Sequence, residues 1–391
     1  MYKQKVEIPP LMMQDDTLAV STCEVKTLKM NNFINTQTNL MGLQFGKKKC
    51  VELHVGKKYN ADICIDCKDD IWGETVSIEK DGKYHINKEF VGSERMEKVN
   101  EKKYLGDIIS FDVKNKKNIV EKTNRAVGIT NKISTTLSER PYGRHHYKAA
   151  KLMRESMMFG SMLNNSESWI NLTKSDIETL EKLDTITQRS IFENNGNPSR
   201  VFMSLELGIV PVKFVIMEKR LKFLKYILEE STSSMIRQVY ETLRKDSTKG
   251  DFIDLVKKDM EELCLTFTEE DIKDMNKIQW KKYVKEVVKE KAFEFLKEEN
   301  GKKSKTKHIT FEQFSTREYL VNNENKSLSK LIFSARSGTL DLKVWNEWKY
   351  GDKTCVMCQK DEENFDHFMT CFFVWTIRYR IIIQRYIWKQ P

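Results

Sequence analysis

Helical periodicity is the feature that most limits how this sequence can fold. From about Asn118 onward, apolar residues recur three and four positions apart, the spacing of one face of an α-helix. Ser175 and Glu178 have the pattern of a capping box at the start of one such stretch. Residues 212–230 follow Pro211 and have the pattern of a strong amphipathic helix. The larger part of the chain is therefore predicted to be helical.

Residues 1–112 have a different pattern and are predicted to form strands and loops with one helix. Residues 50–56 (CVELHVG) alternate as a strand does, and residues 102–110 (KKYLGDIIS) predict another strand ending in a turn. A polar loop is expected between them, over roughly residues 57–100. Farther along, residues 300–310 (NGKKSKTKHIT) lack periodicity and predict a linker. The predicted fold class is α+β, mainly α.

Composition limits the classes of protein that this chain can belong to. Of its 391 residues 39% are hydrophobic and 32% charged, enough for a core beneath a highly charged surface. The sequence has neither a signal peptide pattern nor an apolar run long enough to span a membrane, so an intracellular protein, nuclear or cytoplasmic, is expected. The net charge of +10 suits a polyanionic partner, although a well-solvated, lysine-rich protein would have the same balance.

The most specific motif lies near the C-terminus. In residues 355–371 (CVMCQKDEENFDHFMTC), Cys355, Cys358, His367 and Cys371 follow the pattern C-x2-C-x8-H-x3-C. Eight cysteines in a chain with no secretory signal suit a reducing compartment, where thiols serve as metal ligands more often than they form disulfides. The motif therefore predicts a tetrahedral Zn²⁺ site, which would be structural because all four positions are filled. The alternative is a small apolar core that happens to contain these side chains.

Two adjacent carboxylates near the N-terminus raise a separate question. Asp15 and Asp16 lie between two short apolar runs in residues 9–20 (PPLMMQDDTLAV). They can mark an ordinary hairpin turn, although Thr17 stands where such turns prefer glycine. Because two like charges at a tight tip repel, they can instead mark a cation site, and Mg²⁺ is held in this way by one or two carboxylates.

The order of motifs resembles the palm of a reverse transcriptase of non-LTR retrotransposons, in the Dong-like branch that carries a restriction-like endonuclease. Asp15 and Asp16 stand where that family has its catalytic Asp-Asp pair, so the resemblance implies that both bind Mg²⁺. Residues 42–50 (GLQFGKKKC) are similar to the family's next motif. The resemblance implies that Lys49, with Lys48 as the next best match, is the catalytic lysine, which protonates the leaving pyrophosphate.

The same resemblance extends into the helical part of the chain. Tyr104, Leu105 and Gly106 are similar to the primer grip, which holds the 3′ end of the growing strand. A helical thumb that holds an RNA and DNA template–primer would follow. Its expected phosphate contacts lie at and before a helix, where the alternative is a solvated helix face. They are Arg140, Arg144, Lys148, Lys151 and Arg154.

The Cys-Cys-His-Cys motif resembles the zinc knuckle that stands between thumb and endonuclease in these proteins. The implied segments are residues 1–112 (C-terminal part of the palm), 113–230 (thumb), 231–325 (charged helical connector) and 326–391 (zinc knuckle, with the endonuclease missing). The family's fingers and first catalytic aspartate would precede Asp15, so a fragment that is inactive alone is expected. The alternative function is non-enzymatic nucleic-acid binding by the thumb and the zinc knuckle.

Overall fold

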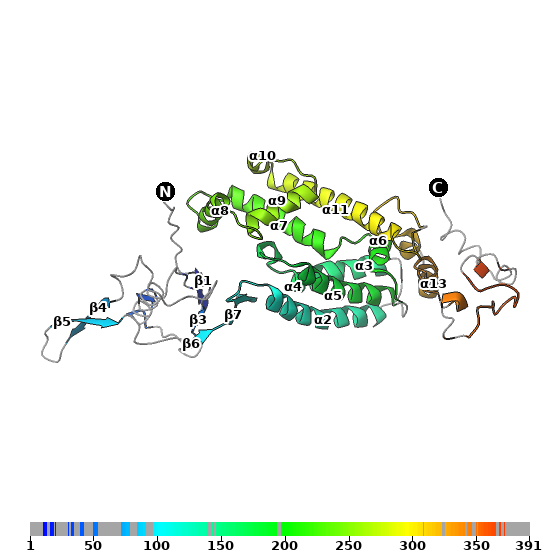
Figure 1. Cartoon of the computed structure of the whole chain (residues 1–391), viewed down its shortest axis with the longest axis horizontal. Helices are drawn as coiled ribbons and strands as arrows, with labels where there is room; N and C mark the ends of the chain where they lie inside the picture. The colour runs from blue at the N-terminus through cyan, green and yellow to red at the C-terminus, as the bar shows by residue number, and fades with distance from the viewer. Residues whose placement is uncertain are drawn as a thin grey trace. The chain divides into compact units, whose positions relative to one another are not determined.

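The structure is a computed structural model (Figure 1) that describes most of the chain from residue 97 onward and short stretches before it. The described residues are 11–13, 16–18, 20, 30, 33–34, 40–42, 50–53, 72–78, 84–90, 97–139, 143, 145–193, 197–307, 309–322, 325–340, 342–345, 349, 351–364, 367–368 and 371. This part is mainly helical, with small strand pairs toward the N-terminus and a cluster of three cysteines and one histidine near the C-terminus, as predicted in outline.

In the described part of the chain, eight strands form four two-stranded sheets. The pairs are β1 (Leu11–Met13) with β2 (Asp16–Leu18), β3 (Val51–Leu53) with β6 (Glu97–Val99), β4 (Trp72–Ile78) with β5 (Tyr84–Phe90), and β7 (Glu101–Tyr104) with β8 (Asp107–Ser110). The β3–β6 pair is parallel and the other three are antiparallel. Met13 pairs with Asp16, so the hairpin expected around the Asp-Asp pair is present, with Gln14 and Asp15 between its strands and outside the described residues.

Two of these pairs correct the predictions made from the sequence. The polar loop expected over residues 57–100 contains the antiparallel pair β4–β5, in which the backbone of Val76 pairs with that of Ile86. Its polar residues alternate with aromatic and β-branched ones, a pattern that suits a strand as well as a loop. Residues 102–110 were predicted as one strand and instead turn back as the hairpin β7–β8. Leu105 (φ 47°) and Gly106 (φ 90°) both have positive φ, as a two-residue type I′ turn requires.

The β7–β8 hairpin is joined to the start of α2 (Lys116–Glu139) by a single buried side chain. The amide of Asn118 donates from Nδ2 to Oδ1 of Asp107 (2.9 Å), and its Oδ1 accepts from the backbone N–H of Ile108 (3.3 Å). Lys117 forms an ion pair with Glu101 on the same hairpin. These contacts hold the hairpin against the first turn of α2.

The remaining helices follow α2 at short intervals, and the capping signals explain where several of them begin. They are α3 (His146–Met153), α4 (Phe159–Met162), α5 (Lys174–Phe192), α6 (Arg200–Leu207), α7 (Val212–Glu229), α8 (Met235–Lys245), α9 (Phe252–Glu262), α10 (Glu269–Asp274), α11 (Lys277–Gly301), α12 (Glu318–Val321) and α13 (Lys326–Arg336), with a π turn η3 (Arg154–Met158) and 3-10 turns η4 (Ser166–Ser168) and η5 (Lys343–Trp345). No helix of the described part is long and apolar enough to cross a membrane.

Two boundary predictions need correction. The capping box of α5 is formed by Thr173 and Asp176, two residues earlier than Ser175 and Glu178, because Thr173 has the extended backbone that an N-cap needs. The linker predicted over residues 300–310 is an ordered turn. Asn300 and Thr306 exchange two hydrogen bonds of 2.9 and 2.7 Å, and Thr306 is buried.

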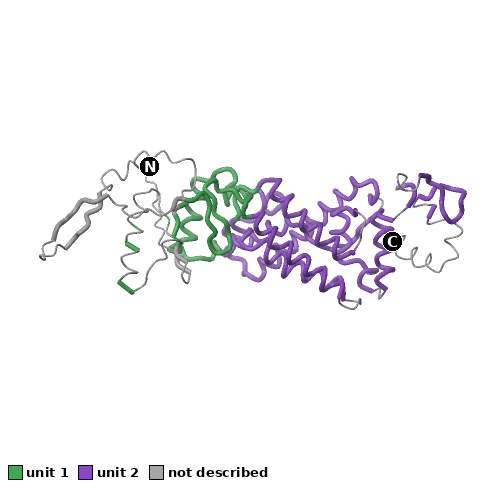
Figure 2. The backbone as a smooth tube through the Cα atoms, turned by 90° about the horizontal axis from the view of Figure 1, so that it is seen from below, with its two compact units in different colours: residues 1–118, 169–172, 227–255 green, residues 119–168, 173–226, 256–391 purple. Residues whose placement is uncertain are grey.

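The chain divides into two compact units (Figure 2). Unit 1 comprises residues 1–118, 169–172 and 227–255, and unit 2 comprises residues 119–168, 173–226 and 256–391. Within unit 2, the hydroxyls of Thr130 and Thr187 meet at 2.9 Å between α2 and α5. The indole of Trp280 on α11 donates to the carbonyl of Leu221 on α7 (3.1 Å). The core of this unit thus includes both early and late helices.

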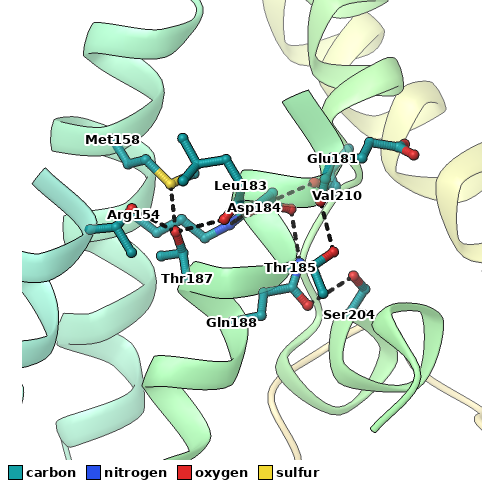
Figure 3. Close-up of polar contacts among 11 residues, drawn as sticks. Arg154, Met158, Glu181, Leu183, Asp184, Thr185, Thr187, Gln188, Ser204 and Val210 are labelled. Atoms are coloured by element: carbon teal, nitrogen blue, oxygen red, sulfur yellow. Dashed lines mark hydrogen bonds and ion pairs between the residues drawn. The ribbon is translucent and has the colours of Figure 1, made fainter. Parts of the chain in front are cut away.

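A buried ion pair fixes the packing of α5 against the helix that runs from α3 through η3 (Figure 3). Arg154 is 1% exposed and Asp184 2% exposed. The guanidinium donates from Nε to Oδ1 (2.6 Å) and from Nη2 to Oδ2 (2.8 Å), and Gln188 donates to the same carboxylate (2.9 Å). Two buried charges are tolerated only when each satisfies the other, so this pair requires one alignment of the two helices.

We expect the single substitutions Arg154→Met and Asp184→Leu each to lower the free energy of unfolding by about 3–5 kcal/mol, because each leaves one buried charge without a partner. The double variant removes both charges and should lose much less than the sum of the two single variants. Urea denaturation of the four proteins measures this coupling. Additive losses would show that the two side chains do not depend on each other.

Candidate metal centre

The candidate site is the cluster of Cys355, Cys358, His367 and Cys371. Each side chain offers one ligand atom, and these four atoms all lie within 4.8 Å of one another. Cys355 and Cys371 are each 3% exposed, while Cys358 and His367 are half-buried. A tetrahedral zinc site places its sulfur and nitrogen ligands about 3.5–3.8 Å apart, so these atoms need to move by about 1 Å at most to coordinate one ion.

Short local contacts bring the first two cysteines to the site. Thr354 and Glu362 form an isolated antiparallel bridge, and the backbone N–H of Cys355 donates to the carbonyl of Asp361 (2.8 Å). Between these points the chain reverses through Gln359, whose φ of 54° lies in the left-handed region. The reversal folds the C-x2-C segment back on itself, so that both sulfurs point to one side.

Backbone amides stabilise the thiolate form of Cys358. The N–H groups of Asp361 and Lys360 donate to its sulfur and, together with His367, lower the pKa of this thiol to about 7. Cys355 receives similar bonds from the N–H groups of Cys358 and Met357, but burial raises its pKa. Zinc binds thiolates, so amides that point at the sulfurs prepare the site for a cation.

The histidine is oriented from both sides of its ring. Nε2 of His367 lies 3.2 Å from Sγ of Cys358 and so faces the cluster. Nδ1 lies 3.6 Å from Oδ2 of Asp361, the arrangement in which a carboxylate orients a metal-bound imidazole. Asn364 accepts from the backbone N–H of His367 (2.7 Å), and the N–H of Cys371 donates to the carbonyl of His367 (2.6 Å). His367 and Cys371 therefore lie one helical turn apart, as predicted.

This donor set suits a structural metal such as zinc. Three thiols and one imidazole are soft or borderline ligands that fill a tetrahedron and leave no open position for a substrate. The prediction from the spacing is thus confirmed as far as the convergence of the four side chains, and these residues could hold the ion. When bound, the metal would supply folding free energy to this small segment.

The surroundings of the site are acidic. Residues 351–364 contain four carboxylates, Asp352, Asp361, Glu362 and Glu363, and two lysines, Lys353 and Lys360. Three thiolates around a divalent ion add one further negative charge. The two side chains between the first cysteines, Val356 and Met357, are apolar and exposed. Neither the charge nor these side chains suits contact with phosphate, which supports a structural role for the metal.

The other residues singled out from the sequence lie in different settings. Asp15, Lys49, Arg140 and Arg144 are outside the described residues, and of Asp16 only the backbone, at the start of β2, is described. Tyr104, Leu105 and Gly106 occupy the turn of the β7–β8 hairpin. Lys148 is exposed on α3, and Lys151 is half-buried there.

Arg154 was predicted to contact phosphate, but the structure places it in the core. Its guanidinium is taken by Asp184, so we do not count it among the groups available to a nucleic acid. The sequence contains no local signal for this difference, because Asp184 is 30 residues away.

Sequence reasoning also missed the groups that support the metal ligands. These are Asp361, whose carboxylate lies beside His367, and the backbone amides around the sulfurs. The signal that could have indicated the role of Asp361 is the acidic turn inside the C-x2-C…H motif.

Comparison of the chain with protein-family models, with curated proteins and with solved structures found no match.

We expect the purified chain to contain about one zinc ion per molecule, because the four ligand atoms already lie within 4.8 Å of one another. Cys355→Ser should reduce the zinc content well below that level. Cys264→Ser is the matched control, because Cys264 is an exposed free cysteine on a different segment. Metal analysis by mass spectrometry after exhaustive dialysis measures the difference. Full zinc content in Cys355→Ser would contradict the assignment.

Proposed function

We propose that the chain is the part of a non-LTR retrotransposon reverse transcriptase that holds a template–primer, with a structural zinc centre after its helices. The order of features supports this proposal: a hairpin around the Asp-Asp pair, a second hairpin with Tyr104–Leu105–Gly106 at its turn, a helical region, and the Cys-Cys-His-Cys cluster. In the parent enzyme, Asp15 and Asp16 would bind Mg²⁺ for DNA synthesis on an RNA template.

The single observation that carries the proposal is the conformation of Leu105. This residue has a φ of 47°, in the left-handed region that leucine rarely adopts, and its side chain is 42% exposed. A type I′ turn prefers asparagine or glycine at this position, so leucine weakens the turn and exposes apolar surface. Such departures from local preference are found at functional sites. We infer that this apolar tip packs against the terminal nucleotide of a primer.

The same hairpin is rigid enough to position a strand end. Its two strands pair over four residues each, and Asn118 and Lys117 attach it to the first turn of α2. A side chain at the tip is therefore held in a defined position relative to that turn. We infer that Leu105 contacts the recessed 3′ end, while Tyr104 and Gly106 shape the turn of the hairpin.

The test is a binding assay on two nucleic acids that differ only at their ends. We expect the chain to bind an RNA–DNA hybrid with a recessed DNA 3′ end more tightly than the same hybrid with blunt ends. Leu105→Asn should remove this preference and leave binding to the blunt hybrid unchanged. Asparagine suits the type I′ turn better than leucine, so the variant keeps the hairpin while it loses the apolar tip.

Phe111→Ser is the control for that assay, because Phe111 is also exposed and lies just after β8. It should retain the preference for the recessed end. Equal affinity of the unaltered chain for both hybrids would refute the reverse transcriptase proposal. That result would favour the alternative, a non-enzymatic nucleic-acid-binding protein.

A further inference from the structure

One surface of α11 carries a row of lysines. Lys281, Lys285 and Lys289 are all exposed and follow one another at intervals of four residues. This interval places side chains on the same side of a helix, about 6 Å apart along its axis. The row lies beside the buried side of the helix, which is marked by Trp280, Val284 and other residues of the core. We call the three residues the lysine row.

Within the part of the chain that the structure describes, none of the three lysines of the row forms an ion pair. Elsewhere on or beside the same helix, Lys291 pairs with Glu294 (2.9 Å) and Lys302 pairs with Glu299 (2.7 Å). Like charges at intervals of four residues repel one another and lower helix stability. The row therefore carries a cost that an external anion would remove.

The nearest carboxylates remove this repulsion only in part. Glu286 lies three residues before Lys289 and is its neighbour on the helix, but no carboxylate of α11 lies three or four residues from the other two lysines of the row. Glu286 and Glu290 follow Lys285 and Lys289 in the sequence, and both are exposed. Adjacent residues of a helix are turned about 100° from each other, so these glutamates form a separate row along the helix. Lys282 is also exposed and lies four residues before Glu286, so this second row is mixed in charge, whereas the lysine row contains only lysines.

A fourth cation joins the lysine row from another helix. Lys151 on α3 is half-buried, and its Nζ donates to the carbonyl of Gly208 (2.5 Å) at the C-terminal end of α6, which packs against α11. Burial lowers the pKa of Lys151, Glu155 opposes this shift, and Arg154, Lys289 and Lys285 lower the pKa further. Lys151 therefore lies within electrostatic reach of two members of the row.

We propose that the lysine row and Lys151 bind the phosphodiester backbone of a nucleic-acid duplex. The surface deepens the proposed function, on which it rests for the identity of that duplex as a template–primer. The proposed surface adds a contact with phosphate on α11, which lies in the segment that the sequence analysis described only as a charged connector. Lysines spaced about 6 Å apart can each reach a phosphate along one strand.

The aromatic side chains near the row favour backbone contact over base stacking. Tyr283 is the aromatic residue within the span of the row, and its ring packs on Phe267 (5.2 Å between centroids) and Trp280 (6.2 Å). It is therefore committed to the packing of α11. Proteins that hold single strands combine basic grooves with free aromatic platforms, whereas contact with phosphate alone accepts a duplex of any sequence.

The experiment compares the full chain with the triple variant Lys281→Gln/Lys285→Gln/Lys289→Gln, and uses a blunt DNA duplex of arbitrary sequence. Glutamine preserves helix propensity and removes the charge. Each lysine that contacts a phosphate contributes about 0.9 to the slope of log affinity against log salt, so the slope should fall by about 2.7. Between 50 and 200 mM salt, binding by the variant should then weaken about 40-fold less than binding by the unaltered chain.

Lys257→Gln/Lys273→Gln/Lys303→Gln is the matched control. These three lysines are exposed in unit 2, and none of them forms an ion pair among the described residues. The control variant should keep a slope within about one unit of the unaltered chain. The single reversal Lys285→Glu tests the row with less change and should weaken binding more than Lys257→Glu. An unchanged slope in the triple variant, or an equal loss in the control variant, would overturn the proposal.

Two further readouts show whether the lysine row binds a duplex and whether it acts independently of Leu105. If vesicles of phosphatidylserine compete with the duplex for the lysine row as strongly as DNA does, the ligand is an anionic membrane surface and the proposal is wrong. The blunt duplex has no recessed 3′ end, so the salt effect does not depend on Leu105. If the unaltered chain does not prefer the recessed end but the triple variant still has the smaller salt slope, only the reverse transcriptase proposal is refuted. If the preference is present but the triple variant keeps the full salt slope, only the proposed role of the lysine row is refuted.

Discussion

Buried charge has to be paired, and this constraint determines which helices of unit 2 pack together. Three carboxylates of this unit are buried against arginines from distant parts of the sequence. The pairs are Arg154–Asp184, Arg220–Asp259 and Arg336–Glu206. A buried ion pair adds little net stability compared with an apolar contact, but breaking one by misalignment is costly. The pairs therefore act mainly by excluding other arrangements of the helices.

The pair of Glu206 has the widest reach along the sequence. Its side chain is fully buried on α6, where Oε1 accepts from Nε (3.0 Å) and Nη2 (2.8 Å) of Arg336 and Oε2 accepts from the hydroxyl of Tyr319 (2.6 Å). Gly208, just after α6, has a φ of 62°, and a side chain there would meet the backbone of Ser315 at 2.7 Å. The helix that precedes the metal centre, α13, is thus held against α6. The carbonyl of Gly208, at the end of α6, also accepts the hydrogen bond from Lys151.

Sequence reasoning succeeded where the signal is local and failed where it is not. The four metal ligands lie within one short segment, so their spacing alone predicted that they converge. The pairing of β4 with β5 was missed because polar residues alternate with aromatic ones, and composition favoured a loop. Arg154 and Lys151 stand three residues apart on one predicted basic helix. Only a partner 30 residues away, Asp184, decides that Arg154 is fully buried while Lys151 is half-buried.

The surface charges of unit 2 differ between the metal centre and the lysine row, and this difference suggests different roles for the two regions. The three core arginines Arg154, Arg220 and Arg336 are occupied by carboxylates, so they are not available to a ligand. Around the metal centre carboxylates outnumber lysines, and the thiolates add negative charge, so this segment repels phosphate. The lysine row has the opposite character. The proposed contacts with the phosphates of a duplex therefore lie on α3 and α11, apart from the contact of Leu105 with the strand end, while a metal bound by the four ligands would stabilise the segment that follows α13.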